Sequence, residues 1–342
     1  MRTFPSVNTV WLFRIGFLTL LVVGAALTQT SGPAELSKAH WYKGNLHTHT
    51  LNSDGDSTPH EVATWYREHR YQFLVLSDHN YLTDPAGLNA IHAVREKFLL
   101  IPGEEVTDSF EKAPVHINAY NPERQIDPQH GASLVATIQR NVEAIRAARA
   151  LPSINHPNFH WAISAQDLLK IKGLGLFEVY NGHPTVNNAG GGGSQSMDEL
   201  WDVLLSANQR LHGIAVDDAH HFKTIGKDLS NPGRGWIQVR AEALTTAAII
   251  GAIEKGDFYA SSGVNLLDVQ VTRDQYRIEI QPRPTEKFTT YFIGEGGKIL
   301  AKSFETAPAY QFAGGEKYVR ARVDSSFGAS AWTQPAFPRS SL

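Results

Sequence analysis

Short strand-like segments alternate with helical segments over residues 42–216 of this 342-residue chain. Short apolar runs bounded by turn residues are typical of strands, and the longer amphipathic stretches between them are typical of helices. Six strands are predicted at residues 42–49, 73–76, 98–101, 115–120, 175–180 and 214–216, and a seventh is predicted just before His156. Strands that alternate with helices in this way predict an α/β fold of the barrel type.

The alternation is interrupted once, between the strands predicted at residues 98–101 and 115–120. The connecting residues 106–114 are too few for the helical crossover that parallel neighbours require. We therefore expect a barrel that is irregular at this point.

Histidine and acidic residues follow most of the predicted strands. They are His47, His49, Asp78, His79, Glu105, His156, Asp218 and His220. Because the carboxyl ends of the strands hold the active site of a parallel barrel, these residues are expected to lie together. Residues two apart on a strand point to the same side, so His47 and His49 can converge while Asp54 folds back from the next loop. Two histidines and a carboxylate suit Zn²⁺, Fe²⁺ or Mn²⁺. For any single member, an ordinary residue of a solvated loop is the alternative.

Taken in order, these residues resemble the motifs of the PHP (polymerase and histidinol phosphatase) family. The matching motifs are His47-Thr48-His49 with Asp54, Ser77-Asp78-His79, Pro102-Gly103-Glu104-Glu105, His116, Asn155-His156-Pro157 and Asp218-Ala219-His220. The resemblance covers about residues 41–263. It implies a distorted seven-stranded (β/α) barrel of the metal-dependent phosphoesterases, with two or three divalent ions that are Zn, Mn or Fe.

The resemblance also implies a ligand set. The first ion takes His47, His49, Glu105 and Asp218, and Glu105 bridges to a second ion held by His116 and His156. A third ion takes Asp54, His79 and His220, although many family members have a histidine where this chain has Asp54. Glu104 competes for the bridging role, but the spacing after Pro102-Gly103 favours Glu105. Asp217 is interpreted as a neighbour of the site.

The implied reaction is hydrolysis of a phosphate ester in a small molecule by a metal-activated hydroxide. Asp218 or His220 could also move protons, and Arg234, Lys43 and His183 are candidate contacts of the substrate. The same hydroxide could instead attack a non-phosphate ester, a carbamate or an amide. A non-catalytic PHP module used for binding is the remaining alternative.

Charge and the amino terminus bear on partners and location. The net charge of −3 leaves no basic surface for nucleic acid, and the sequence carries no signal for an oligomeric state. Residues 1–30 combine a basic start, a short apolar run and small residues, which predicts a secretory signal peptide. We expect an exported, periplasmic or secreted protein without stable membrane insertion after cleavage. An uncleaved anchor beginning at Trp11 is the alternative.

The pattern changes near residue 264. From there to residue 342 short alternating segments replace the helices, and Gly294-Glu295-Gly296-Gly297 is typical of a hairpin turn. We expect a small C-terminal β-sandwich after the barrel, as in exported PHP proteins.

Overall fold

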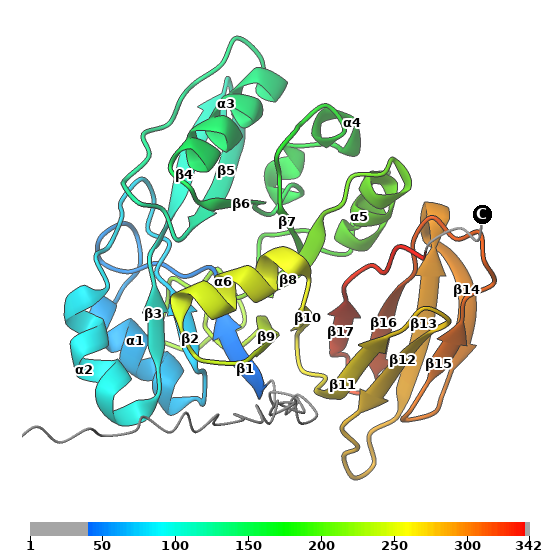
Figure 1. Cartoon of the computed structure of the whole chain (residues 1–342). Helices are drawn as coiled ribbons and strands as arrows, with labels where there is room; N and C mark the ends of the chain where they lie inside the picture. Colours follow the sequence, from blue (N-terminus) through cyan, green and yellow to red (C-terminus); the bar gives the residue numbers. More distant parts are fainter. Residues whose placement is uncertain (1–39, 339–342) are drawn as a thin grey trace, which may run out of the picture. The chain divides into compact units, whose positions relative to one another are not determined.

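The computed structural model describes residues 40–338 and shows a mixed α/β protein (Figure 1). The predicted signal peptide, residues 1–30, lies outside the described residues. Within residues 40–338, no helix combines the length and the apolar character needed to cross a membrane.

The largest sheet has nine strands. Their spatial order is β14 (Lys298–Ser303), β13 (Phe288–Gly294), β16 (Arg320–Ser325), β17 (Ser330–Thr333), β10 (Phe258–Ser261), β9 (Trp236–Ala241), β1 (His40–Asn45), β2 (Phe73–Val75) and β3 (Leu99–Ile101). Only the pairs β1–β2 and β2–β3 are parallel. The sheet therefore begins among the C-terminal strands and ends in a parallel part built by the first strands of the chain.

Two smaller sheets complete the β-structure. The five-stranded sheet consists of β4 (Gly103–Phe110), β5 (Ala113–Tyr120), β6 (Leu151–Ile154), β7 (Leu176–Asn181) and β8 (His212–Val216). The three-stranded sheet consists of β11 (Leu266–Val271), β12 (Gln275–Ile280) and β15 (Ala309–Gln311). Strands β4 and β5 form an antiparallel hairpin, which accounts for the predicted interruption, because a hairpin needs no helical crossover.

The five-stranded sheet meets the nine-stranded sheet at two isolated parallel bridges, Thr48 with Ala219 and His79 with Glu105. His49 N donates to Ala219 O at 2.9 Å. A closed ring of strands is not seen among residues 40–338. Both bridges lie in segments that carry predicted metal ligands, and the junction thus brings the two sets of ligands together.

The helices flank these sheets (Figure 1). They are α1 (Pro59–Glu68), α2 (Ala86–Glu96), α3 (Leu134–Ala147), α4 (Ala165–Leu168), α5 (Met197–Ser206) and α6 (Thr246–Lys255), with the 3₁₀ turns η1 (Phe159–Trp161) and η2 (Glu295–Gly297). Helix α1 begins as its sequence predicts, since Thr58 and Glu61 form a reciprocal capping box and Pro59 opens the first turn.

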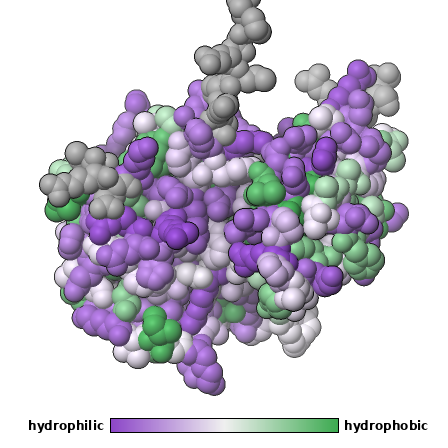
Figure 2. Space-filling model, turned by 90° about the horizontal axis from the view of Figure 1, so that it is seen from below, coloured by the Kyte–Doolittle hydropathy of each residue, from purple (hydrophilic) through white to green (hydrophobic). Residues whose placement is uncertain are grey.

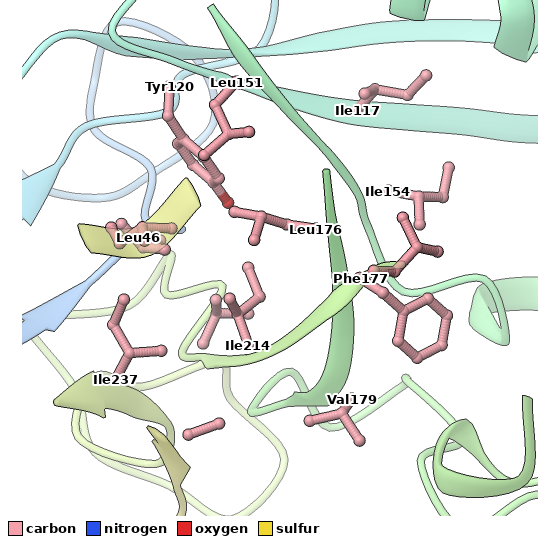
Figure 3. Close-up of a cluster of buried hydrophobic side chains, with 14 of the residues drawn as sticks. Leu46, Ile117, Tyr120, Leu151, Ile154, Leu176, Phe177, Val179, Ile214 and Ile237 are labelled. Carbon is pink, nitrogen blue, oxygen red and sulfur yellow. The ribbon is translucent and has the colours of Figure 1, made fainter. Parts of the chain in front are cut away.

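The main core is built by side chains of the five-stranded sheet and of the first strands of the nine-stranded sheet. Figure 3 shows apolar side chains from β5, β7, β8, β9 and the end of β1 directed toward one another: Leu46, Tyr120, Leu176, Ile214 and Ile237. All five are almost completely buried. Successive residues of a strand face opposite sides, so Phe177 lies on the other face of β7, and Glu178 shares the face of Leu176.

The C-terminal strands have a core of their own between two sheets. It includes Tyr276 and Ile278 of β12 together with Phe292 and Val323 of the nine-stranded sheet. The predicted boundary at residue 264 falls in the loop between β10 and β11, and sheet pairing continues across it because β17 pairs with β10. The two-domain division at residue 264 stays a prediction, since residues 40–338 belong to one compact unit.

Hydrophilic residues predominate on the face shown in Figure 2, and hydrophobic residues form only small groups there. Exposed large apolar side chains such as Ile225 and Phe327 are far apart in the sequence. Scattered apolar residues are normal for a protein surface.

Candidate metal centre

The nine predicted ligands gather where the two larger sheets meet. The loops after β1, β2, β6 and β8 and the strands β4 and β5 supply them: His47, His49, Asp54, His79, Glu105, His116, His156, Asp218 and His220. They form four overlapping groups whose ligand atoms lie within 4.8 Å of one another. Such overlap is what a centre with more than one ion requires.

One group surrounds the inner end of the site. Nε2 of His47 lies 3.5 Å from Oε2 of Glu105 and 3.3 Å from Oδ1 of Asp218. Nε2 of His49 lies 3.5 Å and 3.2 Å from the same two oxygens. All four residues are buried. These distances bring together the four residues predicted for the first ion.

The second oxygen of Glu105 faces a different pair of histidines. Oε1 lies 3.2 Å from Nδ1 of His116 and 3.5 Å from Nε2 of His156. Asn155 Nδ2 donates to this oxygen at 2.8 Å. The two oxygens of Glu105 thus point to two ligand groups, which is the geometry of a bridging carboxylate.

Asp54 joins the outer histidines. Its Oδ1 lies 3.4 Å from Nε2 of His220, and its Oδ2 lies 3.6 Å from Nε2 of His79. Oδ1 is also 3.6 Å from Nδ1 of His49. The Asp54 side chain is 55% exposed whereas the inner ligands are buried, so this group lies at the mouth of the site.

The donor atoms fit metal ions. Nε2 of His47 and Oε2 of Glu105 are buried without a hydrogen-bond partner among the described residues. Burial alone raises the pKa of Glu105, but the imidazoles of His79 and His47 outweigh burial and hold that pKa well below its usual value. Burial lowers the pKa of His49 to about 4, with His220 adding to the effect. Ionised carboxylates and lone-pair-bearing imidazoles are the ligands that Zn, Mn and Fe prefer.

The fold is identified by comparison with solved structures. No protein-family profile matches the sequence, and no curated protein matches it. A two-domain protein from Bacteroides vulgatus that contains a predicted PHP-like metal-dependent phosphoesterase matches in structure with a TM-score of 0.52. The two chains are 16% identical, and the match covers 84% of this chain and 91% of that one. The chain has a PHP-like fold.

Other solved structures match over a smaller share of the chain. A protein from Bifidobacterium adolescentis described as a metal-dependent phosphoesterase is 15% identical, with 55% of this chain and 89% of that chain covered and a TM-score of 0.42. An amidohydrolase from Chromobacterium violaceum is 19% identical, with 55% and 90% covered and a TM-score of 0.37. At these TM-scores the two matches add nothing to the argument.

Within this PHP-like fold, sequence reasoning missed the acid that supports the inner histidines. Oε1 of Glu178 lies 2.7 Å from Nδ1 of His47. Its Oε2 accepts the backbone N–H of His156 at 2.8 Å. A carboxylate that holds the far nitrogen of a ligand histidine fixes its tautomer and orientation. The available signal was an acidic residue inside an apolar strand, in the run Leu176-Phe177-Glu178-Val179.

Two further buried acids hold the ligand loops. Asp78 accepts the backbone N–H of Thr50 at 2.7 Å and the hydroxyl of Ser53 at 2.8 Å, which fixes the loop before Asp54. Asp217 accepts the hydroxyl of Tyr66 at 2.8 Å and backbone N–H groups from the segment after Gly233. Asp217 is in none of the four ligand groups; its place agrees with its interpretation as a neighbour.

Two details of the prediction need correction. Strand β1 ends at Asn45, not at residue 49, because the chain leaves β2 there and Thr48 instead forms a bridge with Ala219. Glu105 lies inside β4, not after a strand. Glu104 points to the opposite face of β4, where its Oε1 accepts the backbone N–H of Ile126 at 2.7 Å. Glu104 is therefore turned away from the ligand groups, and Glu105 lies within them.

The site opens into a cavity of about 240 Å³. Its walls are Asp54, His79, Glu105, His116, His156, Phe159, His183, Asp218 and His220. Two larger hollows, of about 500 and 460 Å³, lie elsewhere, and neither is lined by a predicted ligand. Of the three predicted substrate contacts, His183 lies at the site.

The other two candidate contacts point elsewhere. The guanidinium of Arg234 donates to the carbonyl oxygens of Gly182 at 3.0 Å and Gly226 at 2.9 Å, so its N–H groups are used within the protein. Nζ of Lys43 lies 3.9 Å from the ring centres of both Tyr71 and Trp236. Burial lowers the pKa of Lys43 to about 8. Neither cation lines the cavity, and the expectation that they contact substrate there is not supported.

Proposed function

We propose that this chain is a metal-dependent phosphoesterase that hydrolyses a small-molecule phosphate ester. The observation that carries the proposal is the bridging position of Glu105, whose two oxygens face two different groups of histidines. Structural and catalytic sites for one ion need only three or four ligands. Nine converging ligands with a shared carboxylate support a centre of two or three ions, of Zn, Mn or Fe.

The chain's own residues hold and orient this centre. His47, His49 and Asp218 would hold the inner ion, and Glu105 would share it with His116 and His156. Asp54, His79 and His220 would hold an ion at the mouth. Ions bound there would make water nucleophilic near neutral pH and neutralise the oxygens of a phosphoryl group.

Two residues were predicted to move protons, and their contacts distinguish them. Nδ1 of His220 lies 2.9 Å from the carbonyl oxygen of Asp218. Since a carbonyl only accepts, Nδ1 carries a proton, and Nε2, which faces Asp54, is the nitrogen that would bind an ion. Oδ2 of Asp218 accepts Asn181 Nδ2 at 3.1 Å. Asp218 lines the cavity and is buried against four imidazoles; we assign proton handling to Asp218 besides its place in the inner group, and ligation alone to His220.

We also propose two finer features. The sheets joined at Thr48–Ala219 and His79–Glu105 would form the distorted seven-stranded barrel of the PHP family. The basic, apolar and small residues of segment 1–30 support export to the periplasm or beyond. Amino-terminal sequencing of the protein recovered outside the cytoplasm tests export: a start between residues 26 and 32 supports it, and a start at Met1 contradicts cleavage.

A second candidate function is hydrolysis of a carboxyl ester, carbamate or amide. The observation that favours it is that no lysine or arginine among residues 40–338 lines the cavity. A neutral substrate needs no cation beyond the ions. A non-catalytic module is disfavoured because no predicted ligand position has lost its donor atom.

A substrate panel separates these functions. Purified protein is loaded with Zn²⁺, Mn²⁺ or Fe²⁺, its metal content is measured, and it is offered an aryl phosphate monoester, a phosphodiester, a carboxyl ester and a carbamate. Turnover of a phosphate ester by wild type, and none by His47→Ala, is the expected result. Turnover of only the carboxyl ester or the carbamate would overturn the phosphoesterase proposal. Full metal content with no turnover at all would favour the binding module.

A further inference from the structure

Only two residues of the cavity wall are not predicted ligands, Phe159 and His183. The seven others are occupied in holding ions if the proposed function is correct. The organic group of a substrate can then contact only these two side chains within the cavity wall. Preference for one organic group over another must therefore depend on them.

Phe159 stands over the second ligand group. Its ring centre lies 5.3 Å from that of His156 and 6.3 Å from that of His116. The side chain is half-buried. A large apolar ring in the wall of a metal site offers a flat face to a planar group, since offset and edge-to-face contacts between rings are favourable at such distances.

The chain around Phe159 is fixed in place. Asn158 Nδ2 donates to the carbonyl oxygens of Asn187 at 3.0 Å and Gln195 at 2.8 Å, and Asn187 Nδ2 returns a bond to Asn158 O at 3.2 Å. His160 and Trp161 follow with φ of 53° and 56°. Two consecutive non-glycine residues in the left-handed region are strained, and such strain gathers at functional sites. Phe159 is thus presented to the cavity by a rigid turn.

His183 offers a hydrogen-bond donor on the opposite wall. Its Nδ1 accepts the backbone N–H of Thr185 at 3.3 Å and lies 2.9 Å from the hydroxyl of the same residue. The proton of the neutral imidazole is then on Nε2. Both contacts with Thr185 are made by Nδ1 and neither by Nε2. The ring centres of His183 and Phe159 are 6.4 Å apart.

We infer that the site takes esters whose organic group carries a planar aromatic ring, that this ring packs on Phe159, and that His183 Nε2–H donates to an oxygen of the substrate. This inference rests on the proposed function for the ester and names the class of its organic group. Alternatively, Phe159 only shields His116 and His156 from water. Such a shield would protect the ions without distinguishing one organic group from another.

Binding and turnover are measured together to test this inference. Phenylphosphonate and cyclohexylphosphonate, which are not hydrolysed, are titrated into metal-loaded protein by calorimetry. Phenyl phosphate and cyclohexyl phosphate are compared by kcat/KM. The variants are Phe159→Leu and, as the matched control, Trp161→Leu, because Trp161 is an exposed aromatic of the same turn that does not line the cavity.

We expect wild type to bind the phenyl compound more tightly and Phe159→Leu to lose roughly three- to tenfold of that preference at unchanged metal content. Trp161→Leu should keep the preference. His183→Ala should weaken both phosphonates alike. An unchanged preference in Phe159→Leu, or loss of metal from it, would overturn the inference, as would binding of neither phosphonate. Selective binding that depends on Phe159 without turnover of any phosphate ester would keep the inference and reject the proposed function.

Discussion

Two clusters of buried carboxylates in this protein are neutralised in different ways. In the first, Asp198 and Asp202 of α5 meet Arg320 of β16. Arg320 Nε and Nη2 each donate to Asp202 at 2.7 Å, and Nη2 lies 2.9 Å from Asp198. In the second, Glu105 and Asp218 are surrounded by histidines and no lysine or arginine. The first cluster contains its own permanent cation, whereas the second does not.

The hydrogen bonds show the same contrast. Tyr318 donates to Asp202 at 2.8 Å and Trp332 donates to Asp198 at 3.0 Å, so each aspartate gains a neutral donor besides the arginine. In the metal centre, the polar groups beside Oε2 of Glu105 are imidazoles, and Nδ1 of His79 lies 2.9 Å from it. Buried charge is costly unless it is paired and bonded. The α5 cluster thus carries a fixed positive charge of its own, whereas the carboxylates of the metal centre face imidazoles and would gain further positive charge from bound ions.

The largest expected effect is in the metal centre. Replacing Glu105 with alanine removes a buried carboxylate whose two oxygens face both inner groups, so at least one ion should be lost together with all measurable turnover. Glu104→Gln is the control, because it is the adjacent acid and faces away. Metal content and phosphate-ester turnover are measured on both. A dead Glu104→Gln with an active Glu105→Ala would reverse the assignment of the bridge.

The α5 cluster should respond in stability rather than in metal content. Arg320→Met leaves the buried Asp202 without its cation, whereas Asp198 keeps Arg322 at 3.2 Å. Removing one partner of a buried pair costs about 3–5 kcal/mol in the free energy of unfolding. The exposed pair of Arg149 and Glu123, 3.2 Å apart, is the control, and Arg149→Met should change stability by less than about 1 kcal/mol. Urea unfolding measures both. Equal effects of the two substitutions would remove the distinction between buried and exposed pairs.

Glu178 is a buried acid of a third kind, because it contacts the inner histidines rather than a predicted ion. In Glu178→Gln the amide can satisfy His47 Nδ1–H or the His156 N–H with its oxygen, but its NH₂ then faces the other donor. We expect metal affinity to fall roughly 10- to 100-fold, with the fold intact. Chelator competition measures the affinity, and Glu254→Gln at the surface is the control. An unchanged affinity would mean that Glu178 does not orient the inner histidines.

The sequence predicted those features of the molecule that depend on neighbouring residues in the chain. The apolar run at residues 73–76 predicted β2, and the ordered His, Asp and Glu motifs predicted which side chains meet. Sequence reasoning missed β9, β10 and α6, because a short run such as Trp236–Ala241 becomes a strand only through its distant partners β1 and β10.

The sequence alone also does not show in which direction a side chain points. Arg234 has the right side chain for a phosphate contact, yet its guanidinium is bonded to backbone carbonyls. Nothing in the residue type reveals which neighbour a guanidinium will meet. Glu178 was overlooked because an acid in a buried strand has no evident role in the sequence. Its role becomes visible only when the structure places it beside His47.

Glu104 provides a fourth kind of buried carboxylate, with neither a cation nor a ligand group beside it. Its Oε1 accepts one backbone N–H, and its Oε2 has no partner among residues 40–338. Burial raises the pKa of Glu104 to about 7, from an ordinary value of 4.5. Between these two values the folded protein holds a proton that the unfolded chain has released, so this group lowers stability as the pH rises through that window.

The stability of Glu104→Gln relative to wild type should therefore increase as the pH rises. Glutamine keeps an oxygen for the N–H of Ile126 but cannot ionise, so the variant should match wild type near pH 5 and exceed its stability by about 1–2 kcal/mol at pH 8. Urea unfolding of the metal-free proteins at the two pH values measures this difference, and the titration of the ligand histidines cancels because both proteins contain them. A difference that is the same at pH 5 and pH 8 would show that Glu104 is ionised throughout, and that its carboxylate is stabilised by contacts other than the single bond to Ile126.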